Sequence, residues 1–214
     1  MMVLKFLILF ISFQVIGETD FEKAEKLFNK QQFTEARLLF EDFLKLNPNH
    51  VKSIEYLGDI AGKGKHWDTA IFYYGKLKGL KPLEANYYYK YGGVLGMKAK
   101  ESNKFKALSL IGDVKSSFEK AIQLDSNHIP ARLALIELYL QLPAFVGGSE
   151  AKAKRYANEI VVISPIDGHL AKGRIEEYFK RYKQAEKHYL MAVSIGKSSI
   201  AQQKLIAVQK LIKN

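Results

Sequence analysis

The sequence repeats small, aromatic and proline positions every 34 residues. Five pairs of like residues stand at this separation in the first half of the chain. Small residues leave room where two helices cross closely, and a proline ends a helix. Self-similarity at a fixed period of about 20–50 residues is typical of architectures built from stacked repeats. The pairs are Ala36 with Ala70, Phe40 with Tyr74, Pro48 with Pro82, Leu57 with Tyr91 and Gly58 with Gly92.

A 34-residue unit with a small residue in its first helix, a small and an aromatic residue in its second, and a closing proline resembles the tetratricopeptide repeat. The resemblance implies an all-α, right-handed superhelical solenoid of about five helix–turn–helix units plus a C-terminal capping helix. The cap is expected because the last apolar face of an array has no neighbour. The solenoid would fill residues 18–214, with units at about 18–50, 51–84, 85–128, 129–165 and 166–197, and a cap at 198–213.

Two units are longer than the period. About ten residues are inserted around 97–107, which is rich in lysine, and five within 142–149. In the second insertion, Pro143 should end the preceding helix and Ser149 should cap the next one. This insertion has a weak local resemblance to the regulator of microtubule dynamics family, from which no function is transferred. The role of both insertions stays open.

The first 17 residues are predicted to be a signal peptide. Lys5 gives a positive start, an apolar run follows from Phe6 to Ile16, and polar sequence begins at Glu18. The run is shorter than the roughly 20 residues that span a bilayer, so it fits a cleaved signal better than an anchor. The alternatives are an uncleaved interfacial helix or a first helix of the fold. We expect an exported protein, periplasmic or secreted, without a stable membrane span; association with a membrane surface stays open.

The composition and motifs argue against most kinds of chemistry. The chain has no Cys, which excludes disulfides and thiol nucleophiles. No two His are four residues apart, and the nearest stretch to a phosphate loop, 62–66, lacks the required spacing. The formal charge is +11, but basic residues are interleaved with acidic ones along the chain. We therefore predict no catalytic site, metal, cofactor or nucleic-acid partner.

Stacked helix pairs curve into a superhelix with a concave wall, which in the tetratricopeptide family is lined by the first helix of each unit. A mixed aromatic, apolar and charged wall suits an extended peptide or a helix. Tyr89 is the strongest single candidate, because four tyrosines crowd into 87–91 and they cannot all face the core. Glu55 and Asp59 argue against a clamp for a C-terminal carboxylate, since they would repel it. The predicted wall residues are Phe21, Glu25, Phe28, Lys52, Glu55, Asp59, Asn86, Tyr89, Met97, Leu133, Glu137, Gln141, Leu170, Arg174 and Tyr178.

The leading hypothesis is an exported, non-catalytic scaffold that binds a protein or peptide in this groove. The alternative is an accessory protein of the cell envelope that binds a lipid, a sugar or a transporter substrate. It is motivated by the 13 Phe and 12 Tyr and by the two insertions, which could close over a pocket. An enzyme of the cell envelope ranks third, because only the export signal suggests it.

Overall fold

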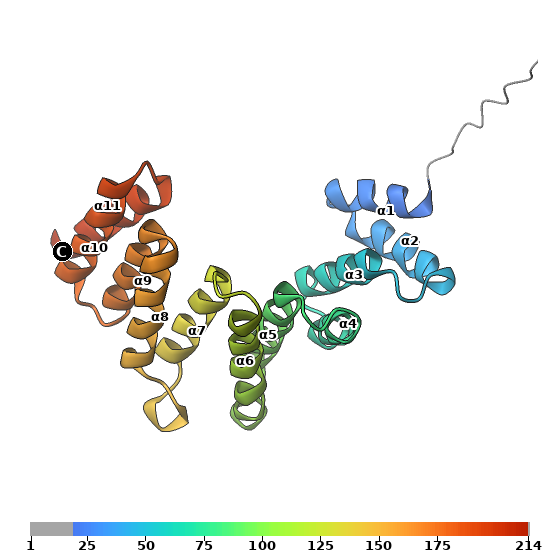
Figure 1. The fold of residues 1–214 in the computed structure, drawn as a ribbon, viewed down its shortest axis with the longest axis horizontal. Helices are drawn as coiled ribbons and strands as arrows, with labels where there is room; N and C mark the ends of the chain where they lie inside the picture. The colour runs from blue at the N-terminus through green and yellow to red at the C-terminus, as the bar shows by residue number, and fades with distance from the viewer. Residues whose placement is uncertain (1–18, 214) are drawn as a thin grey trace, which may run out of the picture.

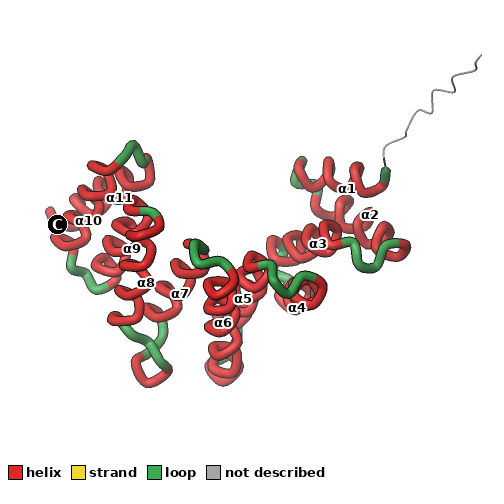
Figure 2. Tube along the Cα trace, viewed as in Figure 1, coloured by secondary structure: helices red, strands yellow, loops and turns green. Residues whose placement is uncertain are grey.

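The computed structural model describes residues 19–213, so the predicted signal peptide lies outside the described residues. These residues form eleven α-helices and one short 3-10 helix, joined by tight connections (Figure 2). The elements are α1 (Asp20–Asn29), α2 (Phe33–Leu46), α3 (Val51–Lys63), α4 (Trp67–Leu80), α5 (Ala85–Glu101), α6 (Lys104–Leu124), α7 (Ile129–Gln141), η1 (Ala144–Val146), α8 (Glu150–Ile163), α9 (Pro165–Tyr178), α10 (Tyr182–Ile195) and α11 (Ser199–Lys213).

The helices form five antiparallel pairs stacked side by side, with α11 after the last pair. Figure 1 shows the stack as an open V, with α1–α4 in one arm and α8–α11 in the other. The predicted all-α superhelical repeat fold is confirmed. Each pair buries its apolar side against the next, as the repeat architecture requires.

The close contact between paired helices recurs along the stack. In three pairs, a glycine of the first helix leaves no room for a Cβ atom beside an aromatic ring of the second. A Cβ on Gly58 would lie 2.9 Å from Cε1 of Tyr74, closer than carbon atoms pack. The small residue and the ring of the predicted repeat therefore face each other. The other such pairs are Gly92 with Phe118 and Gly173 with Tyr189.

The α7–α8 pair reverses the sizes at the equivalent positions. Ile136 of α7 stands where the other first helices carry a small residue, and Ala157 of α8 stands in place of the ring. Both side chains are buried in the same hydrophobic cluster. In α1–α2 the same relationship is kept by Ala24 and Phe40, both completely buried. One large and one small residue thus fill each contact, whichever helix supplies the large one.

The number of residues between the two partners of each contact gives the length of each insertion. Partners are 16 residues apart in α1–α2, α3–α4 and α9–α10, but 26 apart in α5–α6 and 21 apart in α7–α8. The excess agrees with the ten and five residues expected. The first insertion is helical: α5 has 17 residues and α6 has 21, against 13 and 14 in α3 and α4. The second forms the connection that contains η1.

The three pairs without insertions share one turn. Its middle residue, Gln31, Lys65 or Lys180, has φ near +60° (62°, 58° and 57°). In each turn the amide of this residue donates to the carbonyl three residues back, and the next amide donates to the carbonyl five residues back. These are two bonds that commonly close a helix end. The turn between α3 and α4 therefore does not use Gly64, whose φ of −79° suits any residue.

Two histidines begin helices rather than merely occupying loops. The ring of His50 accepts a hydrogen bond from the amide of Ser53 (3.3 Å), and the ring of His128 accepts one from the amide of Ala131 (3.1 Å). Each satisfies an amide that has no partner within its own helix. Their matching places after the second helices of units one and three follow from this capping role.

The capping helix α11 covers the end of the stack only in part. Ala201 and Val208 are fully buried against the last pair. Ile200 and Leu211 of the same helix are 59% and 46% exposed. Ala201 and Val208 are seven residues apart and set a buried stripe too narrow to include Ile200 and Leu211.

Candidate functional site: the inner wall

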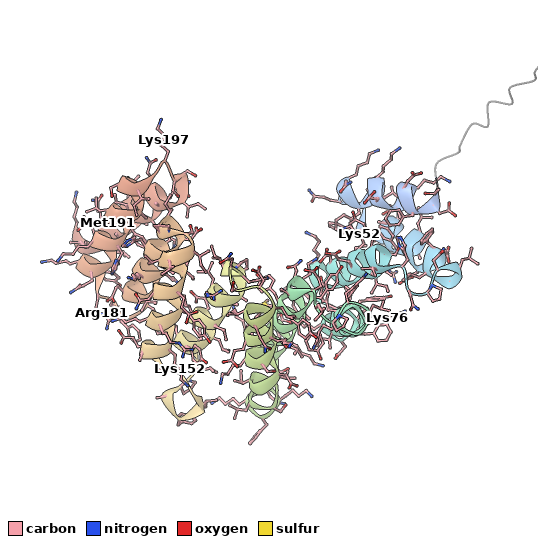
Figure 3. The ribbon with its side chains drawn as sticks, viewed as in Figure 1. Lys52, Lys76, Lys152, Arg181, Met191 and Lys197 are labelled. Carbon is pink, nitrogen blue, oxygen red and sulfur yellow. The ribbon has the colours of Figure 1, made fainter. Side chains whose placement is uncertain are left out.

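The first helix of each pair (α1, α3, α5, α7 and α9) supplies the inner wall. One position recurs along it, occupied by Glu25, Asp59, Gly93, Glu137 and Arg174. Each directly follows the residue that contacts the second helix of its pair. Four of these five residues belong to the predicted set. Lys52 on α3 lies on the inner side of the V and Lys76 on α4 on the outer side (Figure 3).

A charged network joins the wall between α3 and α5. Lys90 Nζ lies 2.9 Å from Glu55 Oε1 and 2.8 Å from Asp59 Oδ1. The Tyr74 hydroxyl donates to Asp59 from the second helix of the same pair. The Tyr87 hydroxyl donates weakly to Glu55 at 3.5 Å. These contacts tie the second helix pair to the third through side chains that are mostly shielded from solvent.

Burial and charge act in opposite directions on this network. Burial alone would raise the pKa of Glu55, but the hydrogen bond and charge of Lys90 outweigh it and hold that pKa below its ordinary value. Burial would lower the pKa of Lys90, but its bonds to Asp59 and Glu55 raise it above the ordinary value. Burial, with the Glu55 charge, raises the pKa of Tyr87 to about 12. The pair is therefore ionised near neutral pH.

This network corrects the electrostatic argument drawn from the sequence. Glu55 and Asp59 were expected to present free negative charge to a ligand. Instead Lys90 bonds to both, and Lys52 lies 3.4 Å from Glu55 as well. Two carboxylates facing two ammonium groups leave no net charge there. Repulsion by these acids therefore no longer argues against an acidic ligand.

Lys90 was missed by the sequence reasoning, although a spacing would have revealed it. The Tyr56 hydroxyl donates to Glu25 at 2.6 Å across the first two pairs. Lys90 donates to Asp59 across the next two. Both donors lie 31 residues after their acceptors. A carboxylate that accepts a hydrogen bond from a donor 31 residues later is therefore a second repeating feature of this chain.

A second ion pair closes the wall between α7 and α9. Arg174 Nε lies 2.9 Å from Glu137 Oε1, and Gln141 donates to the same carboxylate at 3.3 Å. The Arg174 guanidinium also lies 5.8 Å from the centre of the Tyr178 ring. The side chains of Arg174 and Glu137 are each 38% exposed, so a ligand in the groove can reach them.

In the middle of the wall, the recurring position on α5 is Gly93 and carries no charge. A Cβ on Gly93 would have nothing within 4 Å, so the wall is open there. Leu133 and Met97 are 38% and 40% exposed. Gly93 was not among the predicted residues, but its place 34 residues after Asp59 is the feature that identifies it. An uncharged opening thus lies between two ion-paired ends.

Several predicted wall residues are engaged with the protein itself. The Tyr89 ring lies 5.9 Å from Phe118 and 5.2 Å from His128, so it is half-buried in the seam between α5, α6 and α7. Phe28 lies 4.6 Å from Tyr56. Phe21 and Leu170 likewise pack against hydrophobic clusters. Lys52, Asn86, Met97, Leu133, Gln141 and Tyr178 are the predicted residues that remain exposed.

One cleft of the structure lies outside the inner wall, whereas another, at the starts of α5 and α7, includes the wall residue Asn86. The cleft outside the wall has a volume of about 550 Å³, runs between α2 and α4, and is lined by Phe33, Arg37, Lys63 and Tyr73 among others. Neither insertion lines this cleft, but Lys98, Glu101 and Ser102 of the first insertion line a cleft of about 430 Å³ beside the start of α4. Within residues 19–213, no cluster of three or more His, Asp and Glu is arranged to hold a metal ion. No helix of the same region is both long and apolar enough to cross a bilayer.

No family model and no curated protein matches the sequence. Among solved structures, TTC0263, a tetratricopeptide repeat protein of Thermus thermophilus, is 15% identical with a TM-score of 0.66, covering 89% of this chain and 97% of that one. YrrB, described as a tetratricopeptide repeat protein with an unusual peptide-binding site, is 15% identical with a TM-score of 0.58, covering 89% and 90%. Human IFIT1, a dimer with PPP-AAAA, is 24% identical with a TM-score of 0.71, covering 90% of this chain and 45% of that one.

The recurring contacts and the open inner wall define the class of protein: a solenoid of stacked helical hairpins. Its particular fold is that of the tetratricopeptide repeat proteins, which it shares with TTC0263 and YrrB along nearly the whole described chain.

Proposed function

We propose that this protein is a non-catalytic scaffold that binds a polypeptide along the inner wall. The observation that carries the proposal is the uncharged opening at Gly93, which lies between two ion-paired ends of the wall. The ion pairs tie each end of the wall to a neighbouring helix, whereas no side chain fills the centre at Gly93. Such a wall orients an elongated ligand and leaves space for its central side chain.

The chemistry of the wall favours a peptide. Leu133 and Met97 offer exposed apolar surface beside the opening. Asn86 and Gln141, both exposed, offer amide donors and acceptors that match a peptide backbone. A peptide-binding site in YrrB, which has this fold, supports the same use. We propose that the central apolar side chain of the ligand sits over Gly93.

A nucleic-acid ligand fits the wall less well, although IFIT1 shares the fold and is described with PPP-AAAA. Binding a phosphate backbone requires cations that are free to contact phosphates. The inner-wall cations Lys90 and Arg174 already bond to carboxylates of the wall.

Location is a separate part of the proposal: the apolar run from Phe6 to Ile16 supports an exported scaffold.

Peptide selection from a random display library on the purified protein tests the proposal. Affinities of the selected peptides would then be measured for the protein and two variants, Gly93→Phe and Gly112→Phe. Both glycines are in helices, and a Cβ at either has nothing within 4 Å, but Gly112 lies on α6 outside the wall. The first variant should weaken binding by about tenfold or more, the equivalent of 1.4 kcal/mol. The second should leave binding unchanged.

Equal affinity of both variants for the selected peptides would rule out the inner wall. Circular dichroism of each variant provides the folding control. Neither substitution should disturb the helix, because phenylalanine forms helices more readily than glycine.

A further inference from the structure

The two insertions project from the same edge of the solenoid. The connection from first to second helix lies on one edge in every pair, because the pairs are antiparallel and stack in one orientation. The insertions occupy this connection in α5–α6 and α7–α8, in place of the tight turn used by the other three pairs. Figure 1 shows the end of the α5–α6 hairpin and the connection containing η1 together at the lower rim of the molecule.

Each insertion carries a phenylalanine held almost entirely in solvent. Phe105, in the first turn of α6, is 88% exposed, and Phe145, in η1, is 90% exposed. These are the two most exposed aromatic side chains among the large hydrophobic residues of the described chain. A phenylalanine ring left in water forgoes the favourable free energy of burying its apolar surface, so its burial against a partner is favourable. Leu108, one turn along α6 from Phe105, adds a further half-exposed apolar side chain.

The connection that carries Phe145 is held in a fixed shape. The amides of Val146 and Gly148 donate to the Pro143 carbonyl at 2.9 and 3.0 Å. Gly147 has a φ of +102°, and a Cβ on Gly148 would lie 1.9 Å from the Leu142 carbonyl oxygen. Glycine is therefore required at both positions. The exposure of Phe145 follows from this hydrogen-bonded geometry.

Lysines surround the tip of the α5–α6 hairpin, which carries Phe105. Lys100, Lys104 and Lys106 are exposed, and none of them forms an ion pair within residues 19–213. Lys104 and Lys106 stand in the first turn of α6, where positive charge is disfavoured by the helix dipole and no acidic residue offsets it. Of the nearby acids, Glu101 accepts a hydrogen bond from the Trp67 indole at 2.6 Å and Asp68 pairs with Lys98. The tip of the α5–α6 hairpin thus carries several lysines and an exposed aromatic ring, none of which stabilises its helices.

We propose that this edge docks on an anionic lipid membrane, with Phe105 and Phe145 entering the headgroup region. Aromatic rings favour that region, and lysines beside it are attracted to anionic lipids. Two separate projecting tips fit a flat surface, whereas a protein groove would more readily receive one. The inner wall stays free in this arrangement, so the inference does not depend on the proposed function.

The chain contains no Cys, so a single introduced thiol is a unique site for a polarity-sensitive dye. The dye would be attached in three full-length variants, Phe105→Cys, Phe145→Cys and Leu83→Cys. Leu83 is the control: it is 81% exposed but follows α4, on the opposite edge. Vesicles of phosphatidylcholine alone would be compared with vesicles containing about 30% phosphatidylglycerol, whose anionic headgroups attract lysine-rich segments. All variants contain residues 1–18, so any contribution of these residues is common to them.

On the anionic vesicles, the dye at 105 and at 145 should shift to shorter wavelength and be quenched by spin-labelled headgroups. At 83 neither change should occur. The unlabelled double variant Phe105→Asp/Phe145→Asp should bind these vesicles at least about tenfold more weakly than the unmodified chain. The proposal is overturned if the dye responds equally at all three sites, if only position 83 responds, or if positions 105 and 145 respond to protein concentration without vesicles. The last result would assign the edge to a second copy of the chain.

Discussion

Lys90 on α5 lies between Glu55 and Asp59 of α3, with its ammonium nitrogen within 3.0 Å of three carboxylate oxygens. The side chains of Lys90, Glu55 and Asp59 are 21%, 15% and 28% exposed, so the group is largely withdrawn from solvent. Because its members come from successive helix pairs, it sets how the second pair meets the third. This contact gives the first prediction.

Replacing Lys90 by methionine should destabilise the protein by about 3 kcal/mol, because it leaves two shielded carboxylates without their cation. Urea unfolding followed by circular dichroism measures the change. Lys76→Met is the matched control: Lys76 bonds only to the backbone carbonyl of Pro48 at an exposed site, and its loss should matter little. Equal destabilisation by both variants would contradict the assigned role of Lys90.

Lys90→Met should also reverse the direction in which stability changes as the pH falls. In the unmodified protein the pKa of Glu55 is held below 4.5, so its contribution to stability is present above pH 4.5 and is lost as the pH falls through the folded-state pKa. Without Lys90, burial dominates and raises that pKa above its ordinary value. The variant should then gain stability as the pH falls from 7 toward 5. Unfolding curves across this range would show the opposite slope if Lys90 does not set the pKa.

Two glycine-to-alanine substitutions should have opposite effects. A Cβ on Gly173 would lie 2.2 Å from the Tyr189 ring, which is itself fully buried. Gly173→Ala should therefore destabilise the last pair by about 1–3 kcal/mol through overpacking. Gly93→Ala should stabilise the protein by about 0.5–1 kcal/mol, because the site is open and alanine favours helix. Thermal unfolding of both variants is the measurement, and destabilisation by Gly93→Ala would show that the wall is closed there.

His169 and His188 should make stability fall in mild acid. Their rings lie 5.7 Å apart, and burial, with nearby Lys172, lowers the pKa of both below 6.5. The unfolded chain therefore takes up protons first, so stability is lost as the pH falls below 6.5. His188→Gln should flatten this dependence between pH 7.5 and 5.5, as measured by urea unfolding. An unchanged slope would assign the acid sensitivity to other groups.

Arg174→Ala should separate binding from stability. Its ion pair with Glu137 is more than a third exposed on both sides, so solvent screens it and its loss should change stability by less than about 1 kcal/mol. The affinity of peptides selected on the unmodified protein should fall several-fold, because one fixed end of the wall is lost. Titration of a labelled peptide measures this loss. Unaltered affinity would exclude the α7–α9 end from the site.

The fold was predictable because its determining contacts are regular in sequence. Gly58 and Tyr74 stand at positions that geometry forces to recur, since every pair must approach its partner at one close contact. The insertions were countable for the same reason. The secondary structure of the insertions was not predictable. The residues at the start of Lys104–Leu124 can form a helix as readily as a loop, and the choice depends on packing against α5.

The candidate site was only partly predictable, because wall residues act across units. The positions of Glu55 and Asp59 follow from counting within one unit, but the partner Lys90 comes from the next unit and cancels their charge. Tyr89 illustrates the converse. Its register directs it toward the wall, yet Phe118 and His128 draw its ring into the seam between helices. Neither effect is local enough to be inferred from one helix.

The Gly92–Phe118 contact has a wider consequence. It is built like the Gly58–Tyr74 contact although ten more residues separate its partners, so the extra length lies entirely beyond the stacked region. The curvature of the solenoid and the reach of its appendages are therefore independent of each other. Tips on that edge can be lengthened, shortened or exchanged through evolution or by engineering, while the geometry of the inner wall is preserved.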